Sequence, residues 1–218
     1  MIRSEDYSFD TEVEEALEEL TSAQSRLRNL RDRLFILQSA YDDIALRGTD
    51  EHDTAAGSYG YIPIDLNLFF EGLFTLEGLL AADPDYQHPD LPHRPLRFVE
   101  VGCGTGRLVH LLRATDRFAF IDIQGFDLSE TMIALGRERY GLGESLFVAD
   151  CMKIDYSGYD VIFFYRPMKD SAMEQQFEER VIEQMPRGAY LFCFSAAGIH
   201  DDRRLLPRDS RFGIYKRL

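Results

Sequence analysis

Three glycines spaced by two residues mark the segment of the chain most suited to binding a ligand. Gly102, Gly104 and Gly106 follow the largely apolar run 98–101 and precede a helical pattern that begins at Leu108. This order predicts a buried strand, a tight turn and the start of a helix. Glycine lets the backbone bend sharply and lets a ligand approach it without an intervening Cβ. The segment therefore predicts a ligand site on the backbone of residues 102–106.

Carboxylates stand beside this turn and at the ends of the next two predicted strands. Asp127 lies 21 residues past Gly106, a spacing at which a carboxylate can accept both ribose hydroxyls of a nucleoside. Asp150 ends the following strand, and Glu100 precedes the glycines. A dinucleotide turn, G-x-G-x-x-G, would need glycine where the chain has Arg107. A nucleoside ligand is thus expected, with a nicotinamide dinucleotide as the disfavoured alternative.

Strands and helices alternate from residue 97 onward. We expect strands at 97–101, 119–126, 145–149, 159–165 and 189–195, helices at 106–114, 129–138 and 171–185, and a closing hairpin within 204–217. Such alternation indicates an α/β fold: a doubly wound, mostly parallel seven-stranded sheet with helices on both faces. The helix predicted at 65–82 is apolar over much of its surface and should be largely buried.

An N-terminal helical extension precedes the sheet. Apolar residues recur every seven positions over residues 11–46, which predicts one long helix or a helical hairpin capped at Thr11. Glutamates gather in its first half and arginines in its second. Two arrangements fit: the apolar stripe lies on the domain, or two copies form a homodimer with acidic half against basic half. We divide the chain into a helical extension that caps the site (1–82), a proline-rich, non-helical connector (83–96) and a Rossmann-like domain (97–218).

Composition limits the classes of partner. The chain has 218 residues and a formal charge of −14, so it repels phosphate backbones and a nucleic-acid substrate is disfavoured. Its three cysteines are odd in number, which favours reduced thiols. No apolar signal or membrane-spanning run is found, so we expect a cytoplasmic protein that does not contact membranes. No group of residues has the strict spacing of a metal site, and no metal is predicted.

The turn Gly-Cys-Gly-Thr-Gly after Glu100 resembles motif I of the class I S-adenosylmethionine-dependent methyltransferases. The acids after the second and third strands and the Pro-Arg-Gly turn before the fifth are similar to the later landmarks of that family, and the resemblance spans about 97–195. It implies S-adenosylmethionine as cofactor, with its ammonium held by Glu100 or a nearby acidic group, directly or through water. The resemblance also implies that the methionine part rests on the turn, the ribose on the second strand end and the adenine on the third. The residues implied are Glu100, Gly102, Cys103, Gly104, Gly106, Asp127, Leu128, Asp150, Cys151 and Tyr165.

The end of the fourth strand lies where this family places residues that touch the methyl acceptor. Tyr165 and Arg166 occupy it, and His200 after the fifth strand is the candidate base. The sequence Tyr-Arg-Pro-Met departs from the pattern of enzymes that methylate nucleic-acid amino groups. We therefore expect methyl transfer to an oxygen or nitrogen of a small molecule. Two alternatives stay open: a protein-directed methyltransferase that docks its target on the long helix, and a non-catalytic S-adenosylmethionine-binding partner protein.

The segment before the second predicted helix adds one expectation. Tyr59 and Tyr61 flank Gly60, where N-terminal segments of the family often cover the cofactor. They are candidate lid residues, and simple packing of their rings is the alternative.

Overall fold

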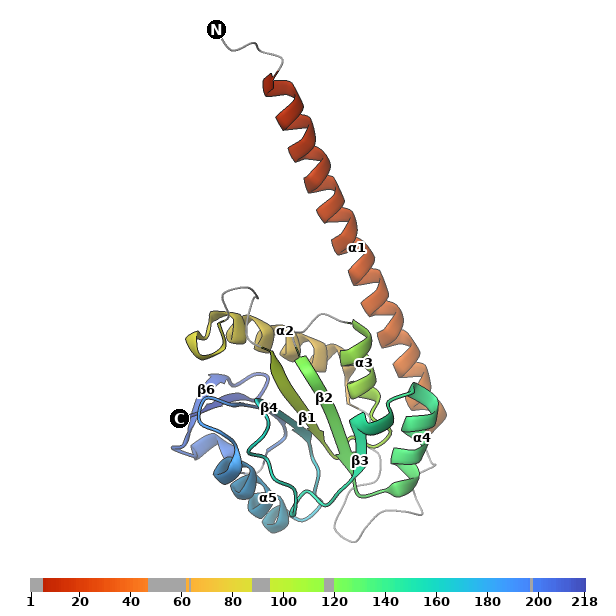
Figure 1. Cartoon of the computed structure of the whole chain (residues 1–218). Coiled ribbons are helices and arrows are strands. Elements are labelled where there is room, and N and C mark those ends of the chain that lie inside the picture. The colour runs from red at the N-terminus through yellow and green to blue at the C-terminus, as the bar shows by residue number, and fades with distance from the viewer. Residues whose placement is uncertain (1–5, 47–61, 63, 88–94, 116–119, 197) are drawn as a thin grey trace.

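The computed structural model describes residues 6–46, 62, 64–87, 95–115, 120–196 and 198–218. At its centre is a seven-stranded sheet with the order β3-β2-β1-β4-β5-β7-β6 (Figure 1). Strands β1 to β5 are parallel, and β7 and β6 form an antiparallel hairpin at one edge. The strands are β1 (Leu96–Val101), β2 (Phe120–Asp127), β3 (Leu146–Val148), β4 (Val161–Tyr165), β5 (Tyr190–Phe194), β6 (Leu205–Asp209) and β7 (Ile214–Arg217). The predicted sheet and closing hairpin are confirmed.

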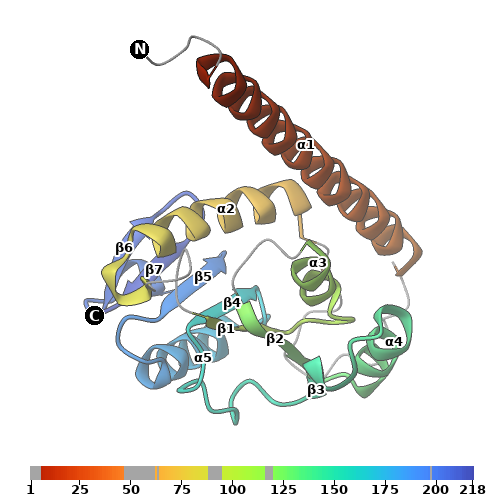
Figure 2. The ribbon, with the colours of Figure 1, turned by 45° about the horizontal axis from the view of Figure 1, so that its top comes forward.

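Helices cover both faces of the sheet (Figure 2). Helices α2 (Leu66–Ala82) and α3 (Arg107–Thr115) pack on one face, and α5 (Ser171–Gln184) packs on the other. Helix α4 (Glu130–Tyr140) lies beside β3. Short 3-10 turns complete this part of the chain: η1 (Pro84–Tyr86), η2 (Gly143–Ser145) and η3 (Ile199–Asp201). The doubly wound arrangement therefore places the central strands β1, β4 and β5 between two apolar layers.

The central strand β4 shows how this layering follows from residue alternation. Phe163 faces α2, and its ring centroid lies 5.1 Å from that of Phe69 and 4.9 Å from that of Phe192. Its neighbour Phe164 faces α5, with its ring centroid 5.0 Å from that of Phe177. All five residues are buried. Since side chains alternate along a strand, a continuous apolar run is needed wherever both faces are covered.

Helix α1 (Asp6–Leu46) is one continuous helix, so the hairpin alternative is wrong. It begins five residues before Thr11, so Thr11 lies inside the helix and is not its cap. No glycine or proline occurs in residues 6–10, so nothing there stops the helix from continuing. The connector also differs from expectation, because η1 begins at Pro84. A helix tolerates proline at its first position, where no N–H donor is needed.

The three cysteines are free thiols that pack in the protein interior. Cys103, Cys151 and Cys193 are all buried and free. Among the described residues, no helix has both the length and the apolar content needed to cross a bilayer.

Candidate cofactor site

The glycine turn between β1 and α3 has the backbone that its sequence predicts. Gly102, Gly104 and Gly106 have φ angles of +70°, +55° and +71°, which side chains with a Cβ rarely adopt. At Gly106 an added Cβ would lie 2.4 Å from the side chain of Leu146, so this side of the turn is closed by β3. At Gly102 an added Cβ would meet nothing within 4 Å. The turn therefore leaves open space beside Gly102, where a ligand can approach the backbone.

The amide groups of the turn are bonded to β2. Gly102 and Cys103 donate to the carbonyl oxygen of Phe126 at 2.9 and 3.0 Å, and Gly104 donates to Oδ2 of Asp127 at 2.8 Å. A phosphate-binding turn instead aims its N–H groups at the ligand. Because these three donors are occupied, the turn suits a neutral or cationic ligand better than a pyrophosphate. This observation supports the exclusion of a dinucleotide.

Asp127 joins the glycine turn to helix α4. Its Oδ1 accepts the N–H of Ser129 at 3.0 Å while its Oδ2 holds Gly104. Ser129 in turn caps α4 by accepting the N–H of Met132 at 3.2 Å. A carboxylate has about four acceptor positions, so both Asp127 oxygens can still accept ribose hydroxyls. The carboxylate is half-buried and fixed in orientation, as a sugar-binding group requires.

The segment after β3 lies against the end of β2, because Ala149 donates to the carbonyl oxygen of Asp127 at 3.0 Å. Asp150 accepts the N–H of Met152 at 2.9 Å and forms an ion pair with Lys153 at 2.9 Å. The hydrogen bond from Lys153 lowers the pKa of Asp150 below its usual value. Burial raises the pKa of Cys151 to about 12, and its side chain belongs to the buried core cluster that contains Phe126 and Phe164.

Two further residues of the predicted set differ in exposure. Leu128, next to Asp127, is 43% exposed, so its side chain is free to cover a bound ligand. Cys103 is 5% exposed, and its side chain packs with Val109 and Leu146. Burial raises the pKa of the Cys103 thiol well above its usual value. Cys103 therefore contributes its backbone to the site.

Glu100 supplies a buried carboxylate at the base of the turn. It is 6% exposed, and its carboxylate accepts a backbone hydrogen bond from Val109. Its Oε2 has no hydrogen-bond partner within the described ranges. Burial, and then the negative charge of Asp127, raise the pKa of Glu100 well above its usual value. A buried acceptor without a donor is costly, and a cationic ammonium group would satisfy it.

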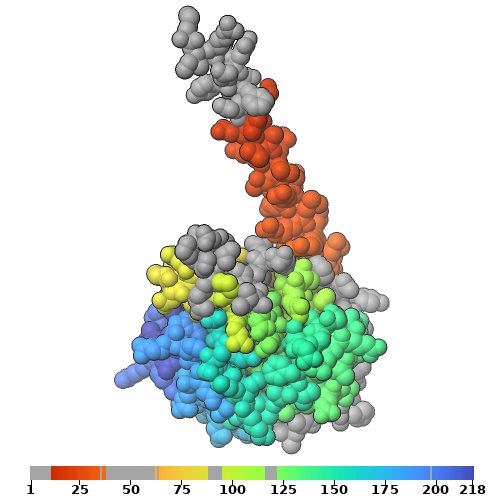
Figure 3. Space-filling view, in the orientation of Figure 1, coloured from red at the N-terminus to blue at the C-terminus, as the bar shows by residue number. Residues whose placement is uncertain are grey.

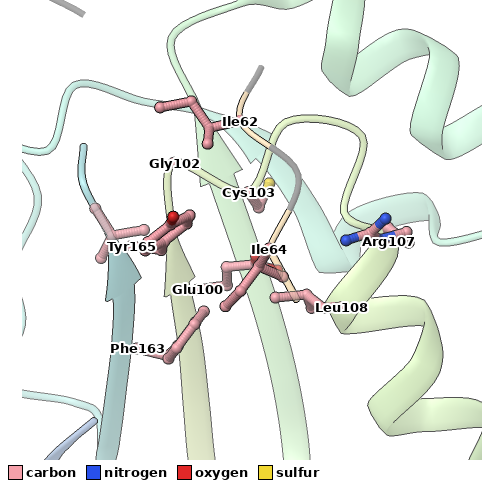
Figure 4. Close-up of a pocket in the computed structure, with 10 residues that line it drawn as sticks. Ile62, Ile64, Glu100, Gly102, Cys103, Arg107, Leu108, Phe163 and Tyr165 are labelled. Atoms are coloured by element: carbon pink, nitrogen blue, oxygen red, sulfur yellow. The ribbon is translucent and has the colours of Figure 1, made fainter. Parts of the chain in front are cut away.

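A narrow pocket connects Glu100 to the end of β4 (Figure 4). It encloses about 40 Å³, which is room for a few atoms such as a small polar group. Ile62 and Ile64, which precede α2, contribute its apolar wall, and Tyr165 lies on the β4 side. The lining residues are Ile62, Ile64, Glu100, Val101, Gly102, Cys103, Arg107, Leu108, Phe163 and Tyr165.

Replacing Glu100 with glutamine is expected to stabilise the ligand-free protein at neutral pH. The ordinary pKa of a glutamate is 4.5, and that of Glu100 is raised in the folded state. Between these two values the folded protein retains a proton that the unfolded chain has released, so stability falls as pH rises. Glu100→Gln removes that decline, and the melting temperature measured against pH should show it.

The same variant should bind S-adenosylmethionine about tenfold more weakly, because a charge-assisted hydrogen bond is lost. Glu138→Gln, which changes an exposed glutamate on α4, is the matched control and should alter neither quantity. An unchanged pH profile for Glu100→Gln would contradict the assigned state of this carboxyl group.

The residues that follow β4 and β5 have strained backbones. Arg166 has a φ of +45° and Ser195 a φ of +61°, and both directly follow strand residues that pair with each other, Tyr165 and Phe194. Such conformations cluster at functional sites. Near them, burial raises the pKa of Glu174, with contributions from Glu178 that raise it and from Arg166 that lower it.

Sequence reasoning missed several of these residues. Glu174 looks like an ordinary acid in the first turn of a helix, and Ser195 has no local signal. The alternation of Ile62 and Ile64 before the cap Asp65 is typical of an extended segment, and it was the available sign that they face a pocket.

His200 lies apart from the pocket that joins Glu100 and Tyr165. Its Nδ1 is 2.6 Å from the hydroxyl oxygen of Tyr215 in β7. Neither His200 nor Arg166 is among the residues that line this pocket. Tyr59 and Tyr61 lie outside the described residues. The structure thus brings together Glu100, the glycine turn, Asp127 and Tyr165, while Arg166 directly follows Tyr165 in the chain.

The described residues fit S-adenosylmethionine on three independent observations. Glu100 offers a buried acceptor to the ammonium, the open side of Gly102 receives the backbone-like methionine part, and Asp127 has free acceptor positions for the ribose.

Residues 98–187 match a protein-family model described as a methyltransferase domain. No protein of curated function matches the chain. The matched range runs from β1 to the turn before β5, and so includes the glycine turn, Asp127 and Asp150.

Several solved structures are similar to the chain. An RNA methyltransferase from Salinibacter ruber, solved with S-adenosyl-L-homocysteine, is 17% identical with a TM-score of 0.46, over 72% of this chain and 92% of that one. An S-adenosylmethionine-dependent methyltransferase from Clostridium acetobutylicum is 14% identical with a TM-score of 0.45, over 60% and 50% of the two chains. An amino pentose methyltransferase from Micromonospora echinaspora, solved with S-adenosylmethionine, is 17% identical with a TM-score of 0.42, over 62% and 58%. The chain thus spans 50% and 58% of the lengths of the last two.

The domain match, the strand order and the geometry of the turn agree with one another. The strand order carries the antiparallel hairpin that the resemblance implies, and Asp127 lies at the end of β2 with its carboxylate against the glycine turn. Residues 98–187 therefore match a methyltransferase domain, and this agrees with the resemblance of the sequence to the class I S-adenosylmethionine-dependent methyltransferases.

Proposed function

We propose that this methyltransferase acts on an oxygen or nitrogen atom of a small molecule. The observation that carries the proposal is the narrow pocket, which reaches from Gly102 on the cofactor side to Tyr165 at the end of β4. Its apolar wall of Ile62 and Ile64 favours a small acceptor over a polymer. The formal charge of −14 adds long-range repulsion of polyanions such as RNA.

The chain's own residues supply binding, orientation and exclusion of water. When bound, S-adenosylmethionine supplies an electrophilic methyl group on a positively charged sulfur leaving group. Glu100 holds the ammonium group of that ligand and Asp127 holds its ribose, and the apolar wall of the pocket keeps water from the reacting atoms. Tyr165 orients the acceptor, and Arg166 binds an acidic group on it. His200 lies apart from this pocket, against Tyr215, so no role in the reaction is assigned to it. Alignment and desolvation are the main demands of this reaction.

The proposal is tested by the release of S-adenosylhomocysteine. The full chain is incubated with S-adenosylmethionine in three separate reactions. The first contains a panel of small hydroxyl and amine acceptors, the second contains RNA and the third contains protein extracts. We expect turnover with members of the small-molecule panel. Turnover with RNA or protein alone would overturn the choice of acceptor, and cofactor binding without any turnover would identify a non-catalytic binding partner.

Replacing Arg166 with methionine is expected to raise the KM for an acidic acceptor about tenfold or more. The guanidinium is exposed beside the end of β4 and offers a planar pair of donors to a carboxylate or phosphate. The Kd of S-adenosylmethionine should hardly change. Steady-state kinetics and calorimetry measure the two constants separately.

Two further variants separate this role from folding. Arg166→Gly removes the guanidinium but relieves a positive φ of +45°, so it should raise KM without lowering the melting temperature. Arg187→Met changes an exposed arginine before β5, at the opposite edge of the sheet, and should leave both constants unchanged. Equal losses of acceptor and cofactor binding in Arg166→Met would show that Arg166 is structural.

A further inference from the structure

Helix α1 carries an exposed apolar stripe along most of its length. Between residues 11 and 31 every side chain is exposed, and Figure 3 shows this part of the helix standing clear of the body. The large apolar residues involved are Val13 (42% exposed), Leu17 (57%), Leu20 (54%), Leu27 (68%), Leu30 (55%), Leu34 (67%) and Leu37 (66%). In a heptad written from Val13 as position a, all of them fall at positions a, d and e. This is the pattern of a coiled-coil seam.

The body of the protein contacts the other side of the helix. Asp32, at heptad position f, is 7% exposed, and Ile36, at position c, packs against the core cluster that contains α2 and α3. The Arg31 side chain donates a hydrogen bond to the carbonyl oxygen of Thr115 at the end of α3. Asp32 and Ile36 therefore hold α1 by the side opposite its seam, while Arg31, at position e, contacts the body from the margin of the seam. The stripe is therefore left open by the described fold itself.

The residues that flank the seam carry an ordered set of charges. Heptad position g is occupied in turn by Glu12, Glu19, Arg26 and Arg33. In an antiparallel helix pair, g positions face g positions of the other helix. Glu12 then lies opposite Arg33 of the second copy, and Glu19 lies opposite Arg26. Since the pair is symmetric, each contact occurs twice.

We propose that α1 pairs in antiparallel orientation with α1 of a second copy of this chain. In the register that aligns those charges, Val13 packs against Leu30 of the second copy, and Leu20 packs against Ala23. A parallel pair would instead place g opposite e, so that Arg26 would meet Arg31 while Glu12 and Glu19 would meet Leu17 and Gln24. Charge complementarity therefore favours a second copy of α1 as the binding partner, and it favours the antiparallel orientation over the parallel one.

The seam and the charges contribute differently to this dimer. The seam supplies the affinity, because its large apolar side chains are removed from water when the two helices pair. Exposed ion pairs contribute much less to affinity, because water and salt screen them. The charges therefore set orientation and register, and reversing them should be decisive because it replaces attraction by repulsion at every g position.

The mass of the full chain in solution tests the proposal first. Sedimentation equilibrium should give twice the 25.1 kDa of one chain at micromolar concentration. If the mass stays that of one chain at every micromolar concentration measured, the proposal is overturned. The apolar stripe would then be a candidate binding surface for a different protein.

Charge reversal tests the pairing itself. The double variant E12R/E19R has arginine at all four g positions, and R26E/R33E has glutamate at all four. Each variant alone should sediment with the mass of one chain, and an equimolar mixture should restore the dimer mass. E15R/E18R reverses two exposed glutamates away from the seam and is the matched control, which should remain dimeric. Circular dichroism and S-adenosylmethionine binding confirm that each variant is folded.

Cysteine cross-linking tests the direction. The native cysteines are buried, so they contribute little background. A mixture of V13C and L30C chains should form a disulfide between the two variants. Disulfides formed by V13C with itself would show a parallel pair and overturn the antiparallel register, as would dimers that persist in E12R/E19R.

Discussion

Asp127→Ala is expected to weaken the binding of S-adenosylmethionine at least about a hundredfold. Hydrogen bonds to a charged acceptor contribute about 1.5–3 kcal/mol each, and two ribose hydroxyls would be lost at once. Since 1.4 kcal/mol is a factor of ten, the loss of about 3 kcal/mol gives this estimate. The variant also frees the N–H groups of Gly104 and Ser129, which are bonded to the carboxylate at 2.8 and 3.0 Å. Isothermal calorimetry measures the change in Kd.

Two related variants make the result specific. Asp127→Asn retains an oxygen acceptor and the shape of the side chain, so its loss should be smaller than that of Asp127→Ala. Asp122→Asn alters the same strand at its other end, where the carboxylate pairs with Arg97 at 3.4 Å, and should leave Kd unchanged. If Asp127→Ala is folded and binds S-adenosylmethionine with the native Kd, the assigned cofactor site is wrong.

Gly136→Ala is expected to destabilise the protein by about 3 kcal/mol or more. An added Cβ on this α4 residue would lie 2.0 Å from the carbonyl oxygen of Thr105 in the glycine turn. The obstacle is backbone, so a change of side-chain rotamer cannot relieve it, and overpacking of this kind costs at least the usual 1–3 kcal/mol. The melting temperature should fall by about 6–12 °C. Thermal unfolding followed by circular dichroism measures it.

Gly78→Ala is the matched control for this experiment. Gly78 is also a helical glycine, on α2, but an added Cβ there would meet nothing within 4 Å. Because alanine favours helix over glycine, this variant should be about 0.5–1 kcal/mol more stable than the native chain. Equal melting temperatures for the two variants would mean that α4 does not lie against the turn as described.

The parts of the site that sequence could predict are those that the backbone dictates locally. The glycines at 102, 104 and 106 all have positive φ, and no other residue type adopts that conformation easily. Asp127 follows from strand length and helix length, because a carboxylate at the end of the second strand must reach the first turn. The observed boundaries of the helices and strands from β1 to β5 lie close to the predicted ranges, because local sequence patterns determine them.

The parts that sequence could not predict depend on distant segments. Ile62 and Ile64 join Tyr165 in one pocket although a hundred residues separate them, and no local pattern reports such a contact. His200 binds Tyr215 across the sheet edge, which depends on how the closing hairpin pairs with β5. The heptads of α1 predicted an apolar seam from sequence alone. They did not predict which side of the helix packs on the body, because that depends on the tertiary contacts of Asp32 and Ile36.

The bonding of the glycine turn to β2 also bears on the kinetics of ligand recognition. With Gly102, Cys103 and Gly104 already bonded to Phe126 and Asp127, the loss of backbone conformational entropy is incurred when the chain folds. Little ordering of this loop is left for the encounter with ligand, so the turn should bind its ligand as a preorganised receptor. Substitutions that loosen the turn should therefore act as an entropic penalty on association, even where every contact to the ligand survives.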